Sequence, residues 1–435
     1  MFKKIYSSLK NINIKLYLAL LVFGFVPTIY TTVRVFLIGQ LPSEWSFSIA
    51  GQLSWVSLLY EIANEAVILP LFYFMGNAIK DKKIFSNRIR TGLIVSLGVY
   101  GILSLFTFIF AESLLKFMAV DSTIFLESLS YIRIECIANI FALLFQFMLI
   151  VLVSINKEKY LYLLTGVRLI LGILVDVLLV SNLPISLKLG INGIGYSNII
   201  VNCVLLITTI FVLYKENIRL FMMGKLDFSW MKEFAKVGMI SGIESFVRNI
   251  AYMVMIARMV NMVSEQGTYW VANSFVWGWL LLPVIQLGEL IKQEVSADKS
   301  NVRRNFDGYI FITSIISVLW FSSIPIWKPF MTHVLGFTNV NKLFDLVLLL
   351  VGFYVLYAFQ NIFDSVFYGL GKTHYMLFES VVTNAIYYGC AFILYVTGVW
   401  LPSLTSIALL FGIGNAFDSL VSFVAYRYML HKEKF

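Results

Sequence analysis

Charged side chains lie inside long apolar segments of this sequence, where ionised groups are costly. An ionised group at bilayer depth costs about 2.5–3.5 kcal/mol, so it usually faces a cavity or a charged partner. The stretch GFVPTIYTTVR (24–34) ends in Arg34, and GMISGIESFVR (238–248) ends in Arg248. Glu244 precedes Arg248 by four residues, which is the favourable order for an ion pair along one helix. These residues predict charge pairing and ion binding within apolar segments.

Three carboxylates add to this chemistry. Asp176 lies in an apolar run, and a lone carboxylate there can bind and release a proton as its surroundings change from wet to dry. Glu61 and Glu65 are four residues apart, so they share one face of a helix. We interpret Asp176, Glu61 and Glu65 as candidates for ion coupling or for lining a substrate cavity.

Polar residues also follow helical faces in the second half of the chain. They are Gln286, Glu289 and Gln293, then Gln360, Asn361 and Asp364, then Glu379 and Thr383, and finally Asn415 and Asp418. Polar faces in both halves favour a water-filled path through the protein. The alternative is that these residues form structural ion pairs that lock helices together.

The composition of the chain indicates which structural elements position these side chains. The chain has 435 residues, of which 60% are hydrophobic and only 13% charged, about half the charged fraction usual in a soluble domain. Long apolar runs recur along its length, which predicts an all-α integral membrane protein. The expected twelve transmembrane helices are 14–40, 46–77, 91–111, 124–154, 160–182, 190–214, 233–261, 267–291, 306–327, 343–370, 374–399 and 401–428. Pro27, Pro70 and Pro283 are expected to kink their helices.

Lys and Arg are distributed unevenly over the loops of this map. If the N-terminus is cytoplasmic, the opposite side receives only Lys116, Lys188, Lys328 and Lys342. The positive-inside rule therefore predicts that both termini are cytoplasmic. The same rule accounts for the net charge of +9, so we expect no nucleic-acid partner. No organelle signal is recognisable, and we expect a multi-pass protein of the plasma membrane.

The chain is expected to divide into two related halves. The Gly-to-Arg stretches 24–34 and 238–248 align, and VSINKEKY (153–160) aligns at a similar offset with YGLGKTHY (368–375). Both halves then begin on the same side of the membrane, as in several transporter folds. We predict two pseudo-symmetric six-helix bundles, 1–214 and 233–435, with a cytoplasmic linker at 215–232.

Enzymatic and cofactor chemistry find little support. GKT (371–373) would need a glycine at Val366 and a preceding strand to be a phosphate-binding loop. The three histidines and three cysteines do not form a metal or haem motif. We expect no enzyme and no cofactor, and we expect a proton or sodium gradient as the driving force.

The sequence resembles the multidrug and toxic compound extrusion (MATE) family. The resemblance is carried by LILGILVDVLLVSNLPISLKLGINGIGYSNIIVN (169–202), by FYGLGKTHY (367–375) and by FLIGQL (36–41), in the family's order. It implies that a carboxylate in span 1 and another in span 5 line a cavity and take part in proton or sodium coupling. Asp176 matches the span-5 position, whereas Arg34 occupies the span-1 position. A functional glutamate of span 7 aligns with Arg248, with Glu244 one turn earlier.

The resemblance implies a secondary active exporter of small organic compounds that works by alternating access as a monomer in the lipid bilayer. Asp176 with Arg34 would be the coupling centre, Arg248 with Glu244 its counterpart in the second half, and Glu61 and Glu65 secondary candidates. A fixed cation at Arg34 would exclude sodium there and would hold a neighbouring Asp176 ionised. Two alternatives remain open. The arginines also suit a flippase for an anionic, phosphate-bearing lipid-linked glycan, and the chain could be a non-transporting membrane assembly partner.

Overall fold

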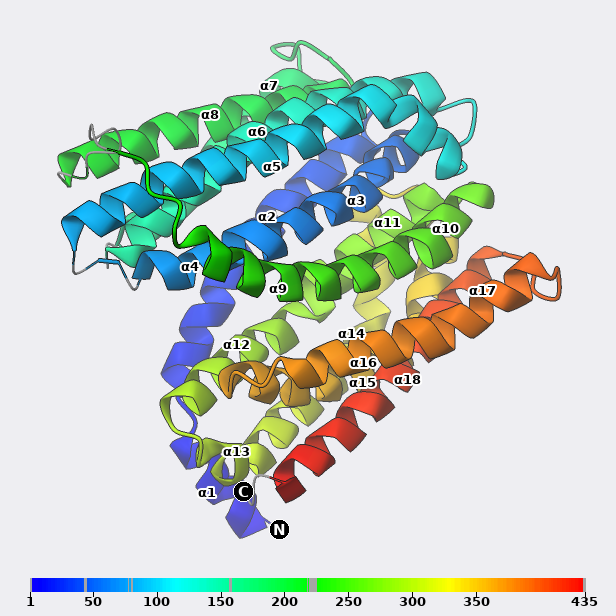
Figure 1. The fold of residues 1–435 in the computed structure, drawn as a ribbon. Coiled ribbons are helices and arrows are strands. Elements are labelled where there is room, and N and C mark those ends of the chain that lie inside the picture. The colour runs from blue at the N-terminus through cyan, green and yellow to red at the C-terminus, as the bar shows by residue number, and fades with distance from the viewer. Residues whose placement is uncertain are drawn as a thin grey trace. The chain divides into compact units, whose positions relative to one another are not determined.

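The computed structural model describes residues 2–42, 45–76, 78–79, 81–155, 159–216, 218 and 225–432, and all regular structure in these residues is helical (Figure 1). Much of the predicted linker 215–232, namely residues 217 and 219–224, lies outside the described residues. By the packing of its backbone the chain divides into two compact units. Unit 1 comprises Met1–Phe36 and Thr268–Phe435, and unit 2 comprises Leu37–Gly267.

This division differs from the predicted bundles 1–214 and 233–435. Most of the first predicted span packs with unit 1, and the seventh predicted span packs with unit 2. The two six-helix bundles were predicted from the internal repeat, and both the repeat and the bundle boundaries stay predictions.

Unit 2 is built around one long helix, which packs against two others. Helix α6 (Phe125–Ser154) packs against α5 (Lys82–Phe117) and α8 (Asn192–Lys215), and α8 also packs against α7 (Lys159–Val180). A second layer joins α9 (Met231–Tyr252) to the interrupted helix α3–η1–α4. The remaining elements have these bounds: α3 (Ser46–Ala63), η1 (Asn64–Ile68), α4 (Leu69–Gly76), η2 (Met253–Ala257) and α10 (Arg258–Met262).

Unit 1 is centred on α15 (Val340–Gly369), which packs against α12 (Leu282–Ala297), α14 (Phe306–His333) and α18 (Leu404–Lys432). Stacked rings of Phe306, Phe363 and Tyr426 join α14, α15 and α18 in its core. The other elements are α1 (Phe2–Asn11), α2 (Ile14–Gly39), α11 (Gln266–Phe275), η3 (Val276–Leu280), α13 (Asn301–Arg304), α16 (His374–Val382), η4 (Thr383–Tyr388) and α17 (Gly389–Val396). Helices α2 and α11 each extend slightly past the boundary of the unit.

Eleven helices in the described residues are long and apolar enough to cross a membrane, and a bent pair makes the number up to twelve. The predicted first span, 14–40, matches α2 closely. Helix α5 is much longer than the predicted third span, 91–111. Asp81 caps the start of this helix by accepting hydrogen bonds from the backbone N–H groups of Lys83 and Ile84. The cap extends α5 beyond the apolar stretch that the sequence pattern detects.

The bent pair corresponds to the predicted span 267–291. Residues Gln266–Leu280 and Leu282–Ala297 meet at an angle of 51°. Pro283 lies in the first turn of α12, where its missing N–H removes a helical hydrogen bond across the break. The kink expected at Pro283 is therefore confirmed.

Four π-helical turns interrupt the membrane helices: η1, η2, η3 and η4. A π-turn widens the helix by one residue and is often found at functional sites. Two of them carry polar side chains that matter below, Glu65 in η1 and Thr383 in η4.

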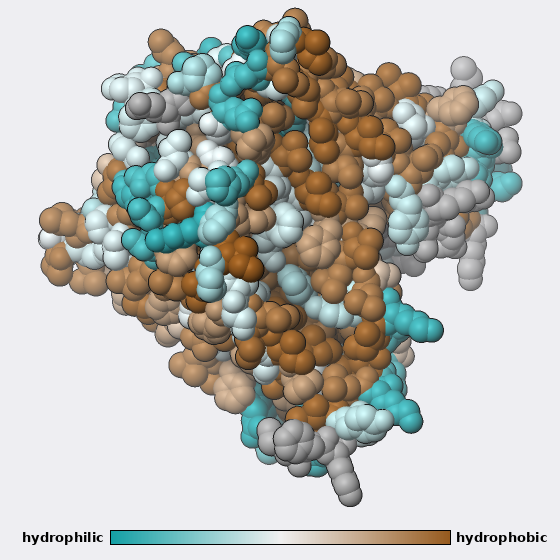
Figure 2. All heavy atoms as spheres, turned by 180° about the vertical axis from the view of Figure 1, so that it is seen from behind, coloured by the Kyte–Doolittle hydropathy of each residue, from teal (hydrophilic) through white to brown (hydrophobic). Residues whose placement is uncertain are grey.

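Large apolar side chains cover much of the surface (Figure 2). On α5, Ile102, Leu105 and Ile109 are 72%, 60% and 56% exposed. Their spacing of three and four puts them on one face of the helix, which only a lipid environment would stabilise. The surface therefore fits a membrane protein.

A polar loop fixes the start of α9 within unit 2. Asp227 accepts hydrogen bonds from the backbone N–H and the hydroxyl of Ser229, and these bonds hold the pKa of its carboxyl below the usual range. Asn87 of α5 exchanges two hydrogen bonds with the backbone of Asp227. The beginning of α9 is thereby tied to α5.

Candidate functional site

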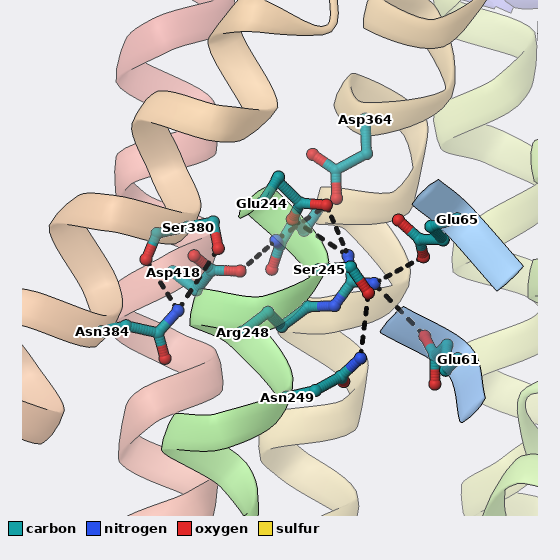
Figure 3. A network of polar contacts seen from close by, with 11 residues as sticks. Glu61, Glu65, Glu244, Ser245, Arg248, Asn249, Asp364, Ser380, Asn384 and Asp418 are labelled. Atoms are coloured by element: carbon teal, nitrogen blue, oxygen red, sulfur yellow. Dashed lines mark hydrogen bonds and ion pairs between the residues drawn. The ribbon is translucent and has the colours of Figure 1, made fainter. Parts of the chain in front are cut away.

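An arginine surrounded by three carboxylates forms the main polar cluster of unit 2 (Figure 3). Arg248 donates from Nη1 to both oxygens of Glu244, at 3.0 and 3.3 Å. Its Nη2 donates to Glu65 at 2.8 Å and to Glu61 at 3.2 Å. We call Arg248, Glu244, Glu61 and Glu65 the arginine cluster. The ion pair expected between Glu244 and Arg248 is thus confirmed.

Close helix packing brings the two sides of the arginine cluster together. Gly238 and Gly242 of α9 lie against Ala66 in η1, so near that a Cβ on Gly238 would be 2.0 Å from the carbonyl oxygen of Ala66. Small residues four apart allow helix backbones to approach closely in membranes. This contact carries α9 to the helix that holds Glu61 and Glu65. The GMISG motif (238–242) was the signal in the sequence that could have predicted the contact.

The cluster is neither fully buried nor fully exposed. The side chains of Arg248 and Glu61 are 38% and 43% exposed, whereas those of Glu65 and Glu244 are 20% and 15% exposed. The low exposure of Glu65 makes its pairing with Arg248 stronger than a fully exposed ion pair would be.

The other two predicted site residues lie in different units. Asp176 in α7 is only 1% exposed and belongs to unit 2. Arg34 in α2 belongs to unit 1, where its guanidinium lies 4.7 Å from the centre of the Tyr30 ring and donates to the Tyr30 hydroxyl. The pairing of Arg34 with Asp176 stays a prediction. Four of the six predicted site residues are brought together, and their functional roles also stay predictions.

Unit 1 contains a second cluster of carboxylates that the sequence singled out only as polar residues within spans. Asp364, Glu379 and Asp418 come from α15, α16 and α18, and Gln360 Nε2 donates to both aspartates. Nothing in the local spacing of these residues predicts that three helices converge on them.

Unit 1 also has two hollows. The larger, about 620 Å³, is lined by apolar and aromatic side chains of α2, α12, α14 and the residues around η3, including Trp279, Trp320, Trp327 and Phe330. The smaller, about 280 Å³, is lined by threonines of α2, among them Thr28, and by Trp277. Their size and lining fit small organic molecules with aromatic or aliphatic parts.

One family model and several solved structures are similar to this chain. Residues 74–178 match the MatE family model. The inward-facing structure of a multidrug resistance MATE family transporter of the MOP superfamily is 17% identical, with a TM-score of 0.79 over 94% of this chain and 95% of that chain. The outward-facing structure described in the same words has a TM-score of 0.65 at 17% identity, over 97% of this chain and 96% of that one.

A third similar structure differs in its described function. It is a MOP superfamily transporter from Pyrococcus furiosus Vc1 (DSM3638), whose reverse polarity of the binding pocket is said to suggest a different function. It is 15% identical, with a TM-score of 0.71 over 97% of this chain and 96% of that chain. No curated protein matches the chain by sequence. The predicted fold class, an all-α integral membrane protein with up to twelve spans, is confirmed.

Proposed function

We propose that the chain is a secondary active exporter. The proposal starts from its similarity to membrane transporters of the MATE type, which are not enzymes. The chain would move small organic compounds outward by alternating access in exchange for protons or sodium. It would work as a monomer in the plasma membrane, with both termini in the cytoplasm and no bound cofactor.

The arginine cluster is the observation that carries this proposal. Glu61 and Glu65 share a single guanidinium nitrogen, Nη2 of Arg248. One guanidinium can balance the charge of only one of these carboxylates, so a proton, a sodium ion or a cationic substrate is favoured beside them. A site that prefers an added cation in one state and releases it in another is what ion-coupled export requires.

The aromatic cavity of unit 1 supports the proposed class of substrate. Trp279, Trp320 and Trp327 offer apolar area and ring faces that attract cations. A lipophilic organic cation combines both properties, and we propose this class as the preferred cargo.

For Asp176 and Arg34 we retain the role in ion coupling that was predicted from the sequence. Asp176 is 1% exposed and lies in an apolar segment, where burying a carboxylate is costly and usually serves a function. We propose Asp176 with Arg34 as the coupling centre and the arginine cluster as a second centre.

The test is transport in reconstituted vesicles under an imposed proton or sodium gradient. Glu65→Gln and Asp176→Asn are each expected to slow gradient-driven export of a fluorescent lipophilic cation. Glu112→Gln is the matched control, since Glu112 is exposed near the end of α5 and pairs with Lys116 at 2.7 Å. Unchanged export in Asp176→Asn would remove Asp176 from the mechanism, and export that ignores both gradients would refute ion coupling.

A flippase for an anionic lipid-linked glycan is the second candidate function. It is favoured by the arginines within spans and by the similar transporter whose binding pocket has reverse polarity. Against it, both terminal nitrogens of Arg248 already donate to carboxylates, so a phosphate would have to displace them. Binding assays that compare cationic dyes with polyprenyl phosphates separate the two functions.

A non-transporting assembly partner would have a dry, inaccessible interior. The exposure of the Glu61 side chain speaks against this. In a variant with cysteine at position 61, labelling by a water-soluble thiol reagent is expected for a transporter, and an unlabelled cysteine would favour the assembly partner.

A further inference from the structure

Three carboxylates of unit 1 converge from three different helices. Gln360 Nε2 lies 2.6 Å from Asp418 Oδ2 and 3.3 Å from Asp364 Oδ2, so one amide joins both aspartates. Glu379, on α16, completes the group. We call Asp364, Glu379 and Asp418 the carboxylate triad. Asp364 and Asp418 are drawn in Figure 3.

Neutral hydroxyls supply the other hydrogen bonds of the triad. Thr383 Oγ1 donates to Asp418 Oδ1 at 2.6 Å, and Ser422 Oγ donates to Asp364 Oδ1 at 2.8 Å. Thr383 is the first residue of the π-turn η4, which follows α16 directly. The triad is therefore held by an amide and two hydroxyls, none of which carries a positive charge.

Glu379 is the member whose hydrogen bonding is incomplete. The residue is 4% exposed, and its Oε1 has no hydrogen-bond partner. The same carboxyl group lies within hydrogen-bonding reach of Asp364. Two ionised carboxylates are both acceptors and cannot bond to each other, so this contact requires a proton on one of them.

No positive side chain balances the triad. Among the described residues none of its members forms an ion pair, and the charged groups that act most strongly on Asp364 and Glu379 are the other members. On α12, which packs against α15, Lys292 pairs with Glu289 at 2.7 Å.

The remaining charged groups of the neighbouring helices lie elsewhere. Glu294 of α12 accepts hydrogen bonds from Asn13, Asn305 and Tyr309. The others lie toward helix ends: Asp307, Lys328 and His333 on α14, Lys342 and Asp345 on α15, His374 on α16, and Arg427, His431 and Lys432 on α18. Among the described residues the triad therefore has no ion-pair partner, and a proton can supply positive charge there.

We propose that Asp364, Glu379 and Asp418 form a proton-binding site in which Asp364 and Glu379 share one proton. A carboxylate and a proton from water combine to form a carboxylic acid, whose O–H donates to the second carboxylate. The described residues contain no group of three His, Cys, Asp or Glu side chains arranged to hold a metal ion, which favours a proton over a divalent cation. This goes beyond the proposed function, because proton binding by the triad does not require export.

The test follows the protonated carboxyl group directly. Infrared difference spectra of the full chain in lipid vesicles, recorded between acidic and alkaline pH, report the C=O band of a carboxylic acid. The wild type is expected to show such a band, which weakens as the pH rises. Glu379→Gln and Asp364→Asn, placed on separate helices, are each expected to lose it, and the control Glu112→Gln is expected to keep it.

Three results would overturn the proposal. The first is a carboxylic-acid band that survives in both variants, and the second is the absence of any such band in the wild type. The third is a band that sodium abolishes at constant pH, because that would assign the site to sodium. Variants that keep the circular dichroism and elution volume of the wild type exclude misfolding as the cause of a lost band.

Discussion

The arginine cluster of unit 2 and the carboxylate triad of unit 1 contain the same number of carboxyl groups but balance their charge differently. In the first, Arg248 is a permanent cation that bonds to all three glutamates. In the second, an amide and hydroxyls supply the hydrogen bonds and no described side chain supplies positive charge. The fixed cation offsets part of the negative charge of the arginine cluster, so we expect the triad, which lacks such a cation, to respond more strongly to proton concentration.

The most severe way to break this comparison is Arg248→Met. It leaves three carboxylates together without a guanidinium and makes the arginine cluster resemble the triad. Removing one partner of a buried ion pair costs about 3–5 kcal/mol, and we expect about 2–3 kcal/mol here because the Arg248 side chain is 38% exposed. Thermal unfolding in detergent measures the change.

Arg248→Lys is the control for Arg248→Met. It keeps the positive charge but loses the planar guanidinium, whose two terminal nitrogens donate to carboxylates of two different helices. Its loss of stability should be smaller, and its stability should vary little between pH 6 and pH 8. Equal stability of Arg248→Met and the wild type would contradict the view that charge pairing holds the cluster.

Gly238→Ala is expected to disrupt the arginine cluster from a distance. The added Cβ would meet the Ala66 carbonyl oxygen at 2.0 Å, so α9 must move away from η1. Overpacking of this kind costs about 1–3 kcal/mol, and it draws Arg248 away from Glu61 and Glu65. Unfolding temperature and export rate should both fall.

Gly98→Ala on α5 is the matched control for that change, because no atom lies within 4 Å of the added Cβ. In a helix interior it should be neutral or slightly stabilising, by up to about 1 kcal/mol. If both alanines behaved alike, close packing of α9 would not explain the position of Arg248.

The triad should give a stronger pH dependence of stability than the arginine cluster. If the folded triad holds a proton that the unfolded chain releases at the same pH, stability falls as the pH rises, by at most about 1.4 kcal/mol per pH unit for one proton. Glu379→Gln removes the need for that proton and should flatten the curve above neutral pH. Unfolding temperatures measured from pH 6 to pH 9 check this, and parallel curves for the two proteins would argue against a bound proton.

The smallest change in stability is expected for Glu61, one of the two glutamates that accept hydrogen bonds from Nη2 of Arg248. Glu61 is more exposed than Glu65 and lies farther from Nη2, at 3.2 Å compared with 2.8 Å. Glu61→Gln should therefore change stability by less than about 1 kcal/mol, as for most exposed ion pairs, and Glu65→Gln should have the larger effect. A reversed order would mean that Glu61 carries the pairing with Arg248.

The sequence predicted local relationships well and distant ones poorly. The pair Glu244–Arg248 could be inferred because a spacing of four fixes its geometry on one helix. The meeting of Arg248 with Glu61 and Glu65 depends on packing between segments far apart in the chain. Only the spacing of Gly238 and Gly242 indicated that packing, and it does not name the partner helix.

The same distinction applies to the fold. Apolar runs predicted the spans because bilayer thickness sets the length of a membrane helix. They did not predict the extension of α5 to Lys82, which depends on a polar cap, or the convergence of Asp364, Glu379 and Asp418. The π-turns were also missed, because a widened turn has no hydrophobic pattern of its own.

The π-turn η1 has a consequence for the length of the chain. A π-turn accommodates one residue more than the α-helix that would replace it, so a single deletion within 64–68 could be absorbed by rewinding the helix. Rewinding the turn without a deletion would instead rotate everything beyond it by about 100°, the angle per residue of an α-helix. Glu61, before the turn, would keep its direction, while residues from 69 onward would face another side. The π-turn therefore sets the rotation between the part of this helix that carries Glu61 and the part from residue 69 onward.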